Sequence, residues 1–151
     1  SNYLKSTIPT QLGRLQKIQS FFDLSDSRLS GTLPTQLGNL DDIEEGFAFS
    51  SNLLSGEIPS ELGRFSVLYS LFMLDNNKLS GEIPSQLGDM EALTMYFEMD
   101  ANSLTSTVPT QLGKLVEMEN GFLLEGNHGL CGYLPTQLAA LSSQVLGFVV
   151  T

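Results

Sequence analysis

Tryptophan is absent from this sequence of 151 residues, and cysteine and histidine occur once each. The single cysteine, Cys131, excludes an internal disulfide. The single histidine, His128, has no evident cysteine, serine or second histidine as a partner, which argues against a catalytic triad or a zinc site. Phosphate-binding loops and dinucleotide-binding motifs are absent as well. The sequence therefore predicts a protein that is not an enzyme, with no catalytic residue, no metal ligand and no cofactor.

Positive charge is also scarce. The sequence has 7 Lys and Arg residues against 17 Asp and Glu residues, a formal net charge of −10. Nucleic acid and anionic membrane surfaces would repel such a protein, so we expect neither as a partner. No apolar run reaches the roughly 18 residues of a membrane span, which predicts no direct membrane insertion by this segment. A cationic partner, a metal ion or a neutral glycan is more compatible with the charge.

Repetition is the main feature that the sequence does have. Its six prolines follow one another at spacings of 25, 25, 25, 25 and 26 residues, and each opens a string such as PTQLG or PSQLG. Thirteen residues after each proline lies a phenylalanine: Phe22, Phe47, Phe72, Phe97, Phe122 and Phe148. An apolar residue follows two positions later, and most turns then have an asparagine: Asn52, Asn77, Asn102 and Asn127. Repeats of this length predict a solenoid of stacked turns.

Each position of the repeat has a physical explanation. The segment F-x-L-x-x-N alternates like a short strand, and it buries its Phe and Leu only when turns stack. We expect the asparagine to end the strand and to bond backbone groups of the adjacent turn. Ser-Gly then permits a bend, proline starts a return arm, and the next Thr or Ser is expected to cap a short helical turn. Return-arm leucines, such as Leu12 and Leu15, are expected to face the core.

The string NNKLSGEIPSQLGDM, which begins at Asn76, resembles the plant-type class of leucine-rich repeats, whose pattern is L-x-x-N-x-L-S-G-x-I-P-x-x-L-G-x-L. The resemblance implies an α/β-type repeat solenoid, a right-handed superhelix with a parallel β-sheet on its concave side and short helical or 3-10 return arms. Such repeats, in that family, build extracellular parts of plant and algal receptor-like proteins and receptor kinases. They also build secreted inhibitors of cell-wall-degrading enzymes and an ice-binding protein. The resemblance thus implies an extracellular or cell-surface location, with an organelle lumen or a larger assembly as alternatives.

We interpret residues 1–151 as one leucine-rich-repeat domain of about six turns of 25–26 residues. The sequence starts within a turn, with Asn2 in the asparagine column, and ends with Phe148 and Val150 of a strand. Solenoids need terminal caps over their exposed core, and we identify none at either end. We therefore expect flanking sequence in the natural protein.

The string EGNHGLCGYLP resembles one that often marks the last repeat of plant receptor ectodomains, where the cysteine joins a capping disulfide. Repeat sequence continues after this string, and no second cysteine follows. We expect Cys131 to be a small, half-buried residue, or to pair with a cysteine outside this segment.

The outward residues of the predicted strands form the expected binding face, because solenoids commonly bind on their concave side. The first outward column is Phe21, Gly46, Leu71, Tyr96, Gly121 and Gly147, and the second is Asp23, Ala48, Met73, Glu98, Leu123 and Val149. Apolar bulk and charge mix on two neighbouring strands, as at the centres of interfaces. The predicted ligand-binding residues are Phe21, Asp23, Leu71, Met73, Asp75, Tyr96, Glu98, Asp100, Leu123 and Glu125.

Three of these residues, Asp75, Asp100 and Glu125, form a ladder of like charges on adjacent strands, which is mildly destabilising. A bound cation or a basic partner would relieve the repulsion; alternatively, these are solvated surface carboxylates. Calcium needs more oxygen ligands than a flat ladder offers, so we predict no metal site.

Three functions compete at this stage. The preferred one is a non-catalytic recognition module that binds a protein, peptide or glycan ligand through the concave face. The second is a structural or assembly subunit of a larger complex. The third is ice or surface binding through a regular Thr/Ser column, which runs from Thr10 to Thr136, although charged neighbours such as Arg14, Asp89 and Lys114 interrupt that surface. The unevenness of the outward columns favours specific recognition.

Overall fold

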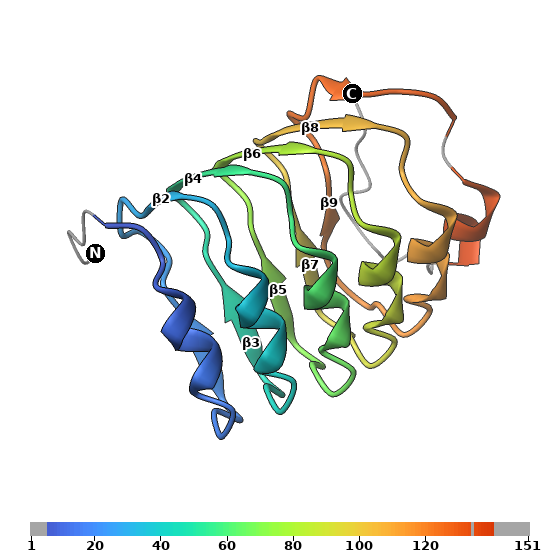
Figure 1. The fold of residues 1–151 in the computed structure, drawn as a ribbon. Helices are drawn as coiled ribbons and strands as arrows, with labels where there is room; N and C mark the ends of the chain where they lie inside the picture. Colours follow the sequence, from blue (N-terminus) through green and yellow to red (C-terminus); the bar gives the residue numbers. More distant parts are fainter. Residues whose placement is uncertain (1–5, 134, 141–151) are drawn as a thin grey trace.

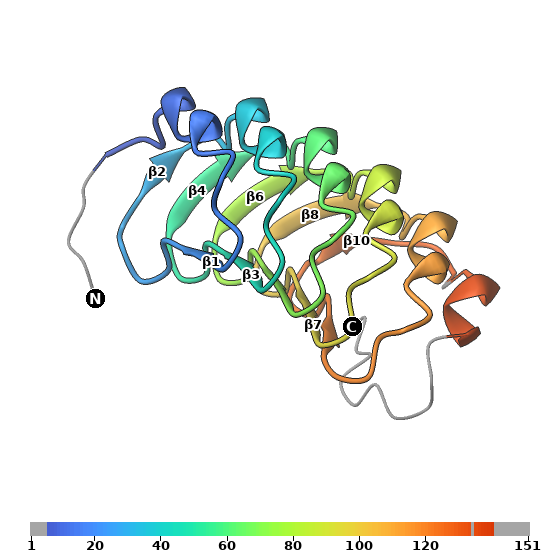
Figure 2. The same ribbon diagram turned by 90° about the horizontal axis from the view of Figure 1, so that it is seen from below.

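The chain forms a coil of stacked turns, which confirms the predicted leucine-rich-repeat solenoid (Figure 1). The computed structural model describes residues 6–133 and 135–140. Three rows of elements run along the coil: two parallel sheets and a row of 3-10 helices, the last best seen in Figure 2. The predicted strand residues Phe148 and Val150 and the partial first turn at Asn2 lie outside the described residues.

The inner sheet has the order β1-β3-β5-β7-β9 and contains the predicted strands. Its members are β1 (Phe21–Asp23), β3 (Gly46–Ala48), β5 (Leu71–Met73), β7 (Tyr96–Glu98) and β9 (Phe122–Leu123). Neighbouring strands pair in parallel with equivalent repeat positions opposite each other, so that Phe47 lies opposite Phe72 and Phe72 opposite Phe97. The 25-residue period of the sequence therefore sets the register of the sheet: each residue pairs with the residue 25 positions later.

A stack of phenylalanines fills the space behind this sheet. The rings of Phe47, Phe72, Phe97 and Phe122 follow one another at centroid distances of 5.9, 5.5 and 5.0 Å, with nearly parallel planes. All four side chains are buried. Since no strand is longer than three residues in this sheet, its apolar face is buried only by the adjacent turns.

The asparagine column joins the turns, as predicted. The Oδ1 atom of Asn102 accepts a bond of 2.9 Å from the backbone N–H of Leu79 in the preceding turn. Its Nδ2 group donates to the carbonyl oxygens of Leu74, at 3.0 Å, and Met99, at 3.2 Å. Equivalent bonds involve Asn52, Asn77 and Asn127. Each amide thus satisfies backbone groups that the bend after a strand would leave unpaired.

A second sheet, with the order β10-β8-β6-β4-β2, was not predicted from the sequence. Its strands are β2 (Ser30–Gly31), β4 (Leu53–Gly56), β6 (Lys78–Gly81), β8 (Ser103–Ser106) and β10 (Gly129–Leu130). β4 and β6 each bury a single leucine and end in Ser-Gly, so their sequences show no alternation and glycine disfavours a strand. The predicted bend is confirmed: three strands end at glycines with φ between 79° and 82°, namely Gly31, Gly56 and Gly81.

The return arms are 3-10 helices that each begin after a proline. They are η1 (Thr10–Arg14), η2 (Thr35–Asn39), η3 (Ser60–Arg64), η4 (Ser85–Asp89), η5 (Thr110–Lys114) and η6 (Thr136–Ala140). The turns approach closely here, because a Cβ atom at Gly63 would lie 2.2 Å from the carbonyl oxygen of Gln86.

Three local expectations were wrong. No side-chain hydrogen bond caps η1–η5; the Thr110 hydroxyl instead contacts the neighbouring Gln111 side chain at 3.2 Å. Leu15 is 44% exposed, because in the described structure its turn packs against another turn on one side only. Cys131 is exposed rather than half-buried; it directly follows β10, the edge strand of the second sheet in the described structure.

Candidate ligand-binding face

The four central residues of the predicted binding face lie side by side on the inner sheet. Strands β5 and β7 pair so that Leu71 is opposite Tyr96 and Met73 is opposite Glu98. All four side chains are half-buried, because alternation along each strand sends them away from the phenylalanine stack. We call these four residues the β5–β7 patch.

The remaining predicted residues are distributed unevenly around this patch. Leu123 on β9 lies opposite Glu98 and extends the patch by one strand. Phe21 and Asp23 are exposed on β1, and strand β3 separates them from β5. The structure therefore brings Leu123 to the patch, whereas Phe21 and Asp23 form a separate region of the same face.

Two glycines allow aromatic side chains to lie against the neighbouring strand. A Cβ atom at Gly121 would lie 3.0 Å from a ring carbon of Tyr96 and 3.5 Å from the Oε1 atom of Glu98, so both side chains lean towards β9. A Cβ atom at Gly46 would similarly lie 2.5 Å from the Phe21 ring. Sequence reasoning missed this arrangement, although a glycine next to an aromatic residue in the same outward column is a usable signal.

The predicted ladder of carboxylates is in fact a cluster. Asp75, Glu98 and Asp100 each offer one carboxylate oxygen within 4.8 Å of the others. Glu98 belongs to a different outward column, and sequence reasoning did not place it with the aspartates. Glu125 is exposed at the edge of the cluster. We call Asp75, Glu98 and Asp100 the acidic cluster.

Asp75 is not the solvated residue that one interpretation of the sequence expected. Only 8% of its surface is exposed. One carboxylate oxygen accepts a hydrogen bond from the Ser50 hydroxyl, and the other accepts one of 2.8 Å from the Asn76 amide. These contacts hold the carboxylate at the base of the cluster, under Glu98 and Asp100 in the neighbouring turn.

Burial and mutual repulsion shift the acidity of the cluster. Burial, followed by the charges of Asp75 and Asp100, raises the pKa of Glu98 from 4.5 to about 7. Burial and the charge of Asp75 also raise the pKa of Asp100, with a smaller contribution from Glu125. Both carboxyl groups are thus easier to protonate than isolated ones. A positive charge placed among them would favour their ionised forms.

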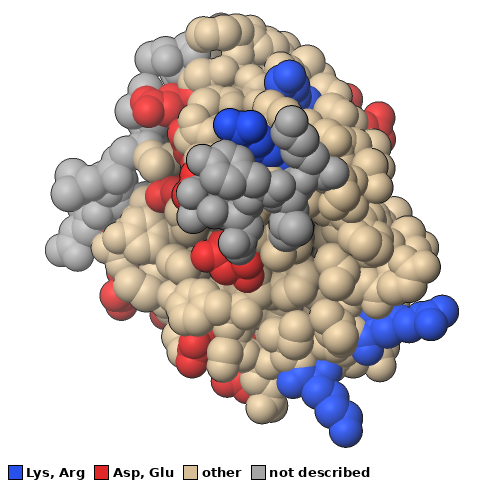
Figure 3. All heavy atoms as spheres, turned by 90° about the vertical axis from the view of Figure 1, so that its left-hand side faces the viewer, with Lys and Arg blue, Asp and Glu red and all other residues tan. Residues whose placement is uncertain are grey.

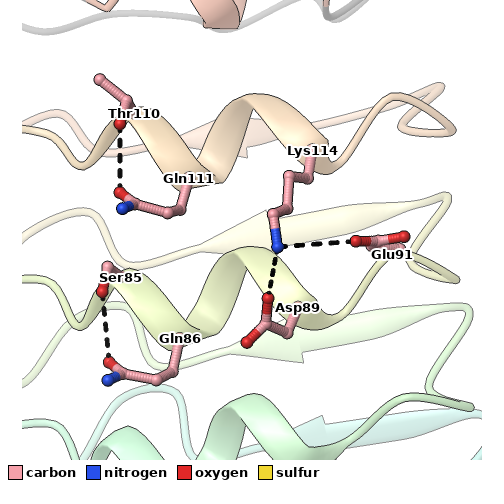
Figure 4. Close-up of polar contacts among 7 residues, drawn as sticks. All are labelled: Ser85, Gln86, Asp89, Glu91, Thr110, Gln111 and Lys114. Atoms are coloured by element: carbon pink, nitrogen blue, oxygen red, sulfur yellow. Dashed lines mark hydrogen bonds and ion pairs between the residues drawn. The ribbon is translucent and has the colours of Figure 1, made fainter.

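The charge distribution agrees with this picture. In the end view of Figure 3, several acidic side chains of the described residues lie on the left-hand side, towards the inner sheet. On the return arms, by contrast, Lys114 lies between two carboxylates, 2.7 Å from Asp89 and 3.8 Å from Glu91 (Figure 4). Charge is therefore paired on the row of helices shown in Figure 4 and clustered with one sign on the inner sheet.

A groove of about 930 Å³ lies on a different side of the molecule, between the second sheet and the helices. Its lining includes Glu57, Ile58, Glu82 and Ile83, which occupy equivalent positions in successive turns. Because similar side chains line the groove in successive turns, the groove follows from the repeat itself and does not distinguish one turn from another. The β5–β7 patch, in contrast, is made of residues that differ from strand to strand.

Comparison with known proteins connects this geometry to a family. The profile of the family described as Leucine Rich Repeat matches residues 20–40. The ectodomain of the plant membrane receptor kinase GASSHO1/SCHENGEN3 from Arabidopsis thaliana, solved in complex with CASPARIAN STRIP INTEGRITY FACTOR 2, is 38% identical, with a TM-score of 0.84. The match covers 96% of this chain and 17% of that chain. The chain belongs to the plant-type leucine-rich-repeat family.

Other leucine-rich-repeat structures are similar as well. The HAESA ectodomain from Arabidopsis, in complex with an extended IDA peptide hormone ligand, is 32% identical with a TM-score of 0.85, over 96% of this chain and 24% of that chain. A plant ice-binding protein is 30% identical with a TM-score of 0.78, over 92% of this chain and 43% of that chain. This leucine-rich-repeat chain spans about a fifth of the length of the receptor ectodomains described here.

No curated protein matches the chain significantly. Among the residues that the structure describes, no helix has the length and apolar character needed to cross a membrane.

Proposed function

We propose that this leucine-rich-repeat domain is a non-catalytic recognition module that binds a protein or peptide ligand through its inner sheet, outside the cell or at the cell surface. The observation that carries the proposal is the β5–β7 patch, in which four half-buried side chains of different character adjoin each other. Two similar ectodomains are in complex with CASPARIAN STRIP INTEGRITY FACTOR 2 and with an IDA peptide hormone, which supports a ligand of this kind.

The contrast between inward and outward positions supports the location of the site. Inward positions repeat almost without change, because each must fit between identical neighbours. The outward column containing Leu71 and Tyr96 mixes large side chains and glycines in no regular order. A surface made of repeated side chains would suit a regular lattice, whereas these differences suit one specific partner.

The proposal is tested by selecting binders from a displayed library of random peptides on the immobilised chain. Selected peptides are then synthesised and their dissociation constants measured by calorimetry. A triple variant, Met73→Ala, Tyr96→Ala and Glu98→Lys, is expected to weaken binding by about tenfold or more, because it removes the apolar contacts and reverses one charge. The matched control changes three exposed return-arm residues: Thr35→Ala, Gln86→Ala and Gln111→Ala.

Selected peptides that bind the inner-sheet variant as tightly as the unchanged chain would contradict the proposal, and would favour a different surface or an assembly role. Loss of binding in the return-arm control instead would place the site on the helices. A neutral glycan is tested in the same way, by calorimetry of plant and algal oligosaccharides with both variants.

Ice binding is a second candidate, because a plant ice-binding protein is among the similar structures. The Thr/Ser column on the return arms is regular, and Thr10, Thr35 and Thr110 are exposed. Lys114 and Asp89 project from the same row of helices, however, and their charges disturb a flat hydroxyl array (Figure 4). We expect no inhibition of ice recrystallisation by the purified chain; clear inhibition that is lost on Thr35→Lys would make this candidate the better one.

A further inference from the structure

The β5–β7 patch and the acidic cluster are two parts of one continuous surface on the inner sheet. Glu98 belongs to both, since it pairs with Met73 across the strands and lies within 4.8 Å of carboxylate oxygens of Asp75 and Asp100. Tyr96 and Glu98 lean towards β9 over Gly121. An apolar floor therefore continues directly into a region of concentrated negative charge.

We propose that this surface binds an extended peptide segment whose lysine or arginine side chain enters the acidic cluster while a neighbouring apolar side chain packs on Leu71, Met73 and Tyr96. This inference rests on the proposed function and adds the chemistry of the ligand to it. Charge complementarity identifies the occupant, because the chain carries a net charge of −10 and gathers three carboxylates at the edge of the patch.

A basic side chain fits both halves of the surface. The aliphatic stems of lysine and arginine cover apolar surface while their charged ends remain at polar groups, so the stem can lie along Met73 and the head group at Glu98. An arginine offers five N–H donors in a planar fork, which suits carboxylates arriving from two neighbouring turns. The Tyr96 ring adds a face on which a guanidinium group can stack.

A calcium ion fits the cluster less well than a basic side chain. Calcium takes about six to eight oxygen ligands, and three carboxylates with restricted positions supply only part of that shell. Asp75 is held by Ser50 and Asn76, so it cannot turn to supply both of its oxygens to an ion without losing these bonds. A planar guanidinium needs only a few acceptors in its own plane.

Binding of a basic side chain should depend on pH. The charged groups facing Glu98 are Asp75 and Asp100, and the residues beside it in the following turn, Gly121 and Leu123, do not ionise. Burial and these two charges raise the pKa of Glu98 to about 7, and a bound cation favours the ionised carboxylate. Affinity is therefore expected to increase as the pH rises from about 6 to about 8, because Glu98 loses its proton in this range.

The test begins with the sequences of the selected peptides and then uses one synthetic peptide in two forms. The first form contains arginine, and the second contains citrulline, which has nearly the same shape without the charge. We expect lysine or arginine to be enriched next to an apolar residue, and citrulline to weaken binding by about tenfold. Glu98→Gln and Asp100→Asn should each weaken the arginine peptide and leave the citrulline peptide unchanged.

Matched controls separate the cluster from the overall negative field. Glu117→Gln and Asp41→Asn change the net charge by the same amount at exposed positions in the turns that follow η5 and η2. The affinities of both peptides should be the same for these controls as for the unchanged chain. Glu98→Gln, in contrast, should remove the increase of affinity between about pH 6 and about pH 8. If the controls and the cluster variants lose the same affinity for the arginine peptide, the inference is overturned, since long-range attraction alone would explain the binding.

Other outcomes separate this inference from the proposed function. Selected peptides that lack basic residues but lose binding on Met73→Ala and Tyr96→Ala would support the recognition site and overturn the basic-peptide inference. If neither the patch variants nor the cluster variants affect binding, both the proposed function and the basic-peptide inference are overturned. The last test is a titration with calcium chloride alone. If calcium binds saturably, displaces the arginine peptide and no longer binds after Glu98→Gln, the cluster is a metal site and the basic-peptide inference is overturned.

Discussion

Two columns of polar residues run side by side along this solenoid, two positions apart in each turn. One contains Asn52, Asn77, Asn102 and Asn127, and the other contains Asp75, Asp100 and Glu125. The asparagines are satisfied by backbone groups of two turns, whereas burial and neighbouring carboxylates make Asp100 easier to protonate. Stacking the same polar group in every turn thus stabilises the fold when the group is a neutral amide and opposes it when the group is charged. The second column is therefore the one for which we propose a partner.

The largest effect is expected from the amide column. Replacing Asn102 with alanine leaves the buried N–H of Leu79 and the carbonyl of Leu74 without this partner. We expect a loss of about 3 kcal/mol in the free energy of unfolding, because each unsatisfied buried group costs about 1–3 kcal/mol. Urea denaturation measures the change. The control Asn39→Ala removes a half-exposed amide whose bond from Arg64 is 3.4 Å long, and should cost far less.

The second prediction concerns the pH dependence of stability. Because the folded chain raises the pKa of Glu98 from 4.5 to about 7, the folded state holds this proton more tightly than the unfolded state. The contribution to stability is therefore present below about pH 4.5 and is lost as the pH rises through about 7. Since solvent screens a half-exposed group, we expect only about 1 kcal/mol.

This prediction is checked by comparing Glu98→Gln with the unchanged chain in urea at several pH values. The variant should show a smaller decrease of stability between about pH 5 and about pH 8, because its amide does not titrate. Identical pH profiles for both proteins would show that the cluster does not repel itself in solution. The exposed control Glu117→Gln should reproduce the profile of the unchanged chain.

A smaller effect of opposite sign to the asparagine variant is expected at Asp100. Asp100→Asn removes the repulsion from Asp75 and Glu125, so it should stabilise the chain at pH 8 by about 0.5 kcal/mol. The double variant with Glu98→Gln should gain less than the sum of the two changes, because both act on one cluster. If Asp100→Asn destabilises the chain, the Asp100 carboxylate contributes a hydrogen bond that the fold needs. The carboxylate column would then stabilise the fold in part, as the asparagine column does.

The sequence predicts the repeating part of this molecule well. The register of the inner sheet, the stack containing Phe72 and Phe97, and the bonds of Asn102 all follow from one period, because each residue meets its own counterpart in the next turn. The second sheet escaped prediction because strands such as β4 and β6 have one buried residue each and end in Ser-Gly, which predicts a bend rather than a strand.

The site was predicted less completely than the repeat. Its outward residues follow from alternation, but the acidic cluster depends on how side chains lean. The carboxylate of Glu98 lies within 4.8 Å of those of Asp75 and Asp100, and the buried Asp75 carboxylate accepts hydrogen bonds from Ser50 and Asn76. Among the described residues, this is the one place where three carboxylates lie so close together, so the period of the sequence does not reveal the cluster. Column position alone therefore places these residues on one face of the sheet but does not predict the arrangement of charges on it.

The smallest effect is expected on the return arms, where charges of opposite sign are paired. Lys114 contacts Asp89 and Glu91, and the hydrogen bond from Lys114 to Asp89 raises the pKa of this lysine. All three side chains are about half exposed or more, so solvent and salt weaken the pair. Lys114→Met should leave the free energy of unfolding unchanged within the error of urea denaturation. If Lys114→Met lowers the free energy of unfolding by as much as Asp100→Asn raises it, surface ion pairs stabilise this fold. The repulsion among the carboxylates of the inner sheet would then also oppose folding more strongly than expected from their position.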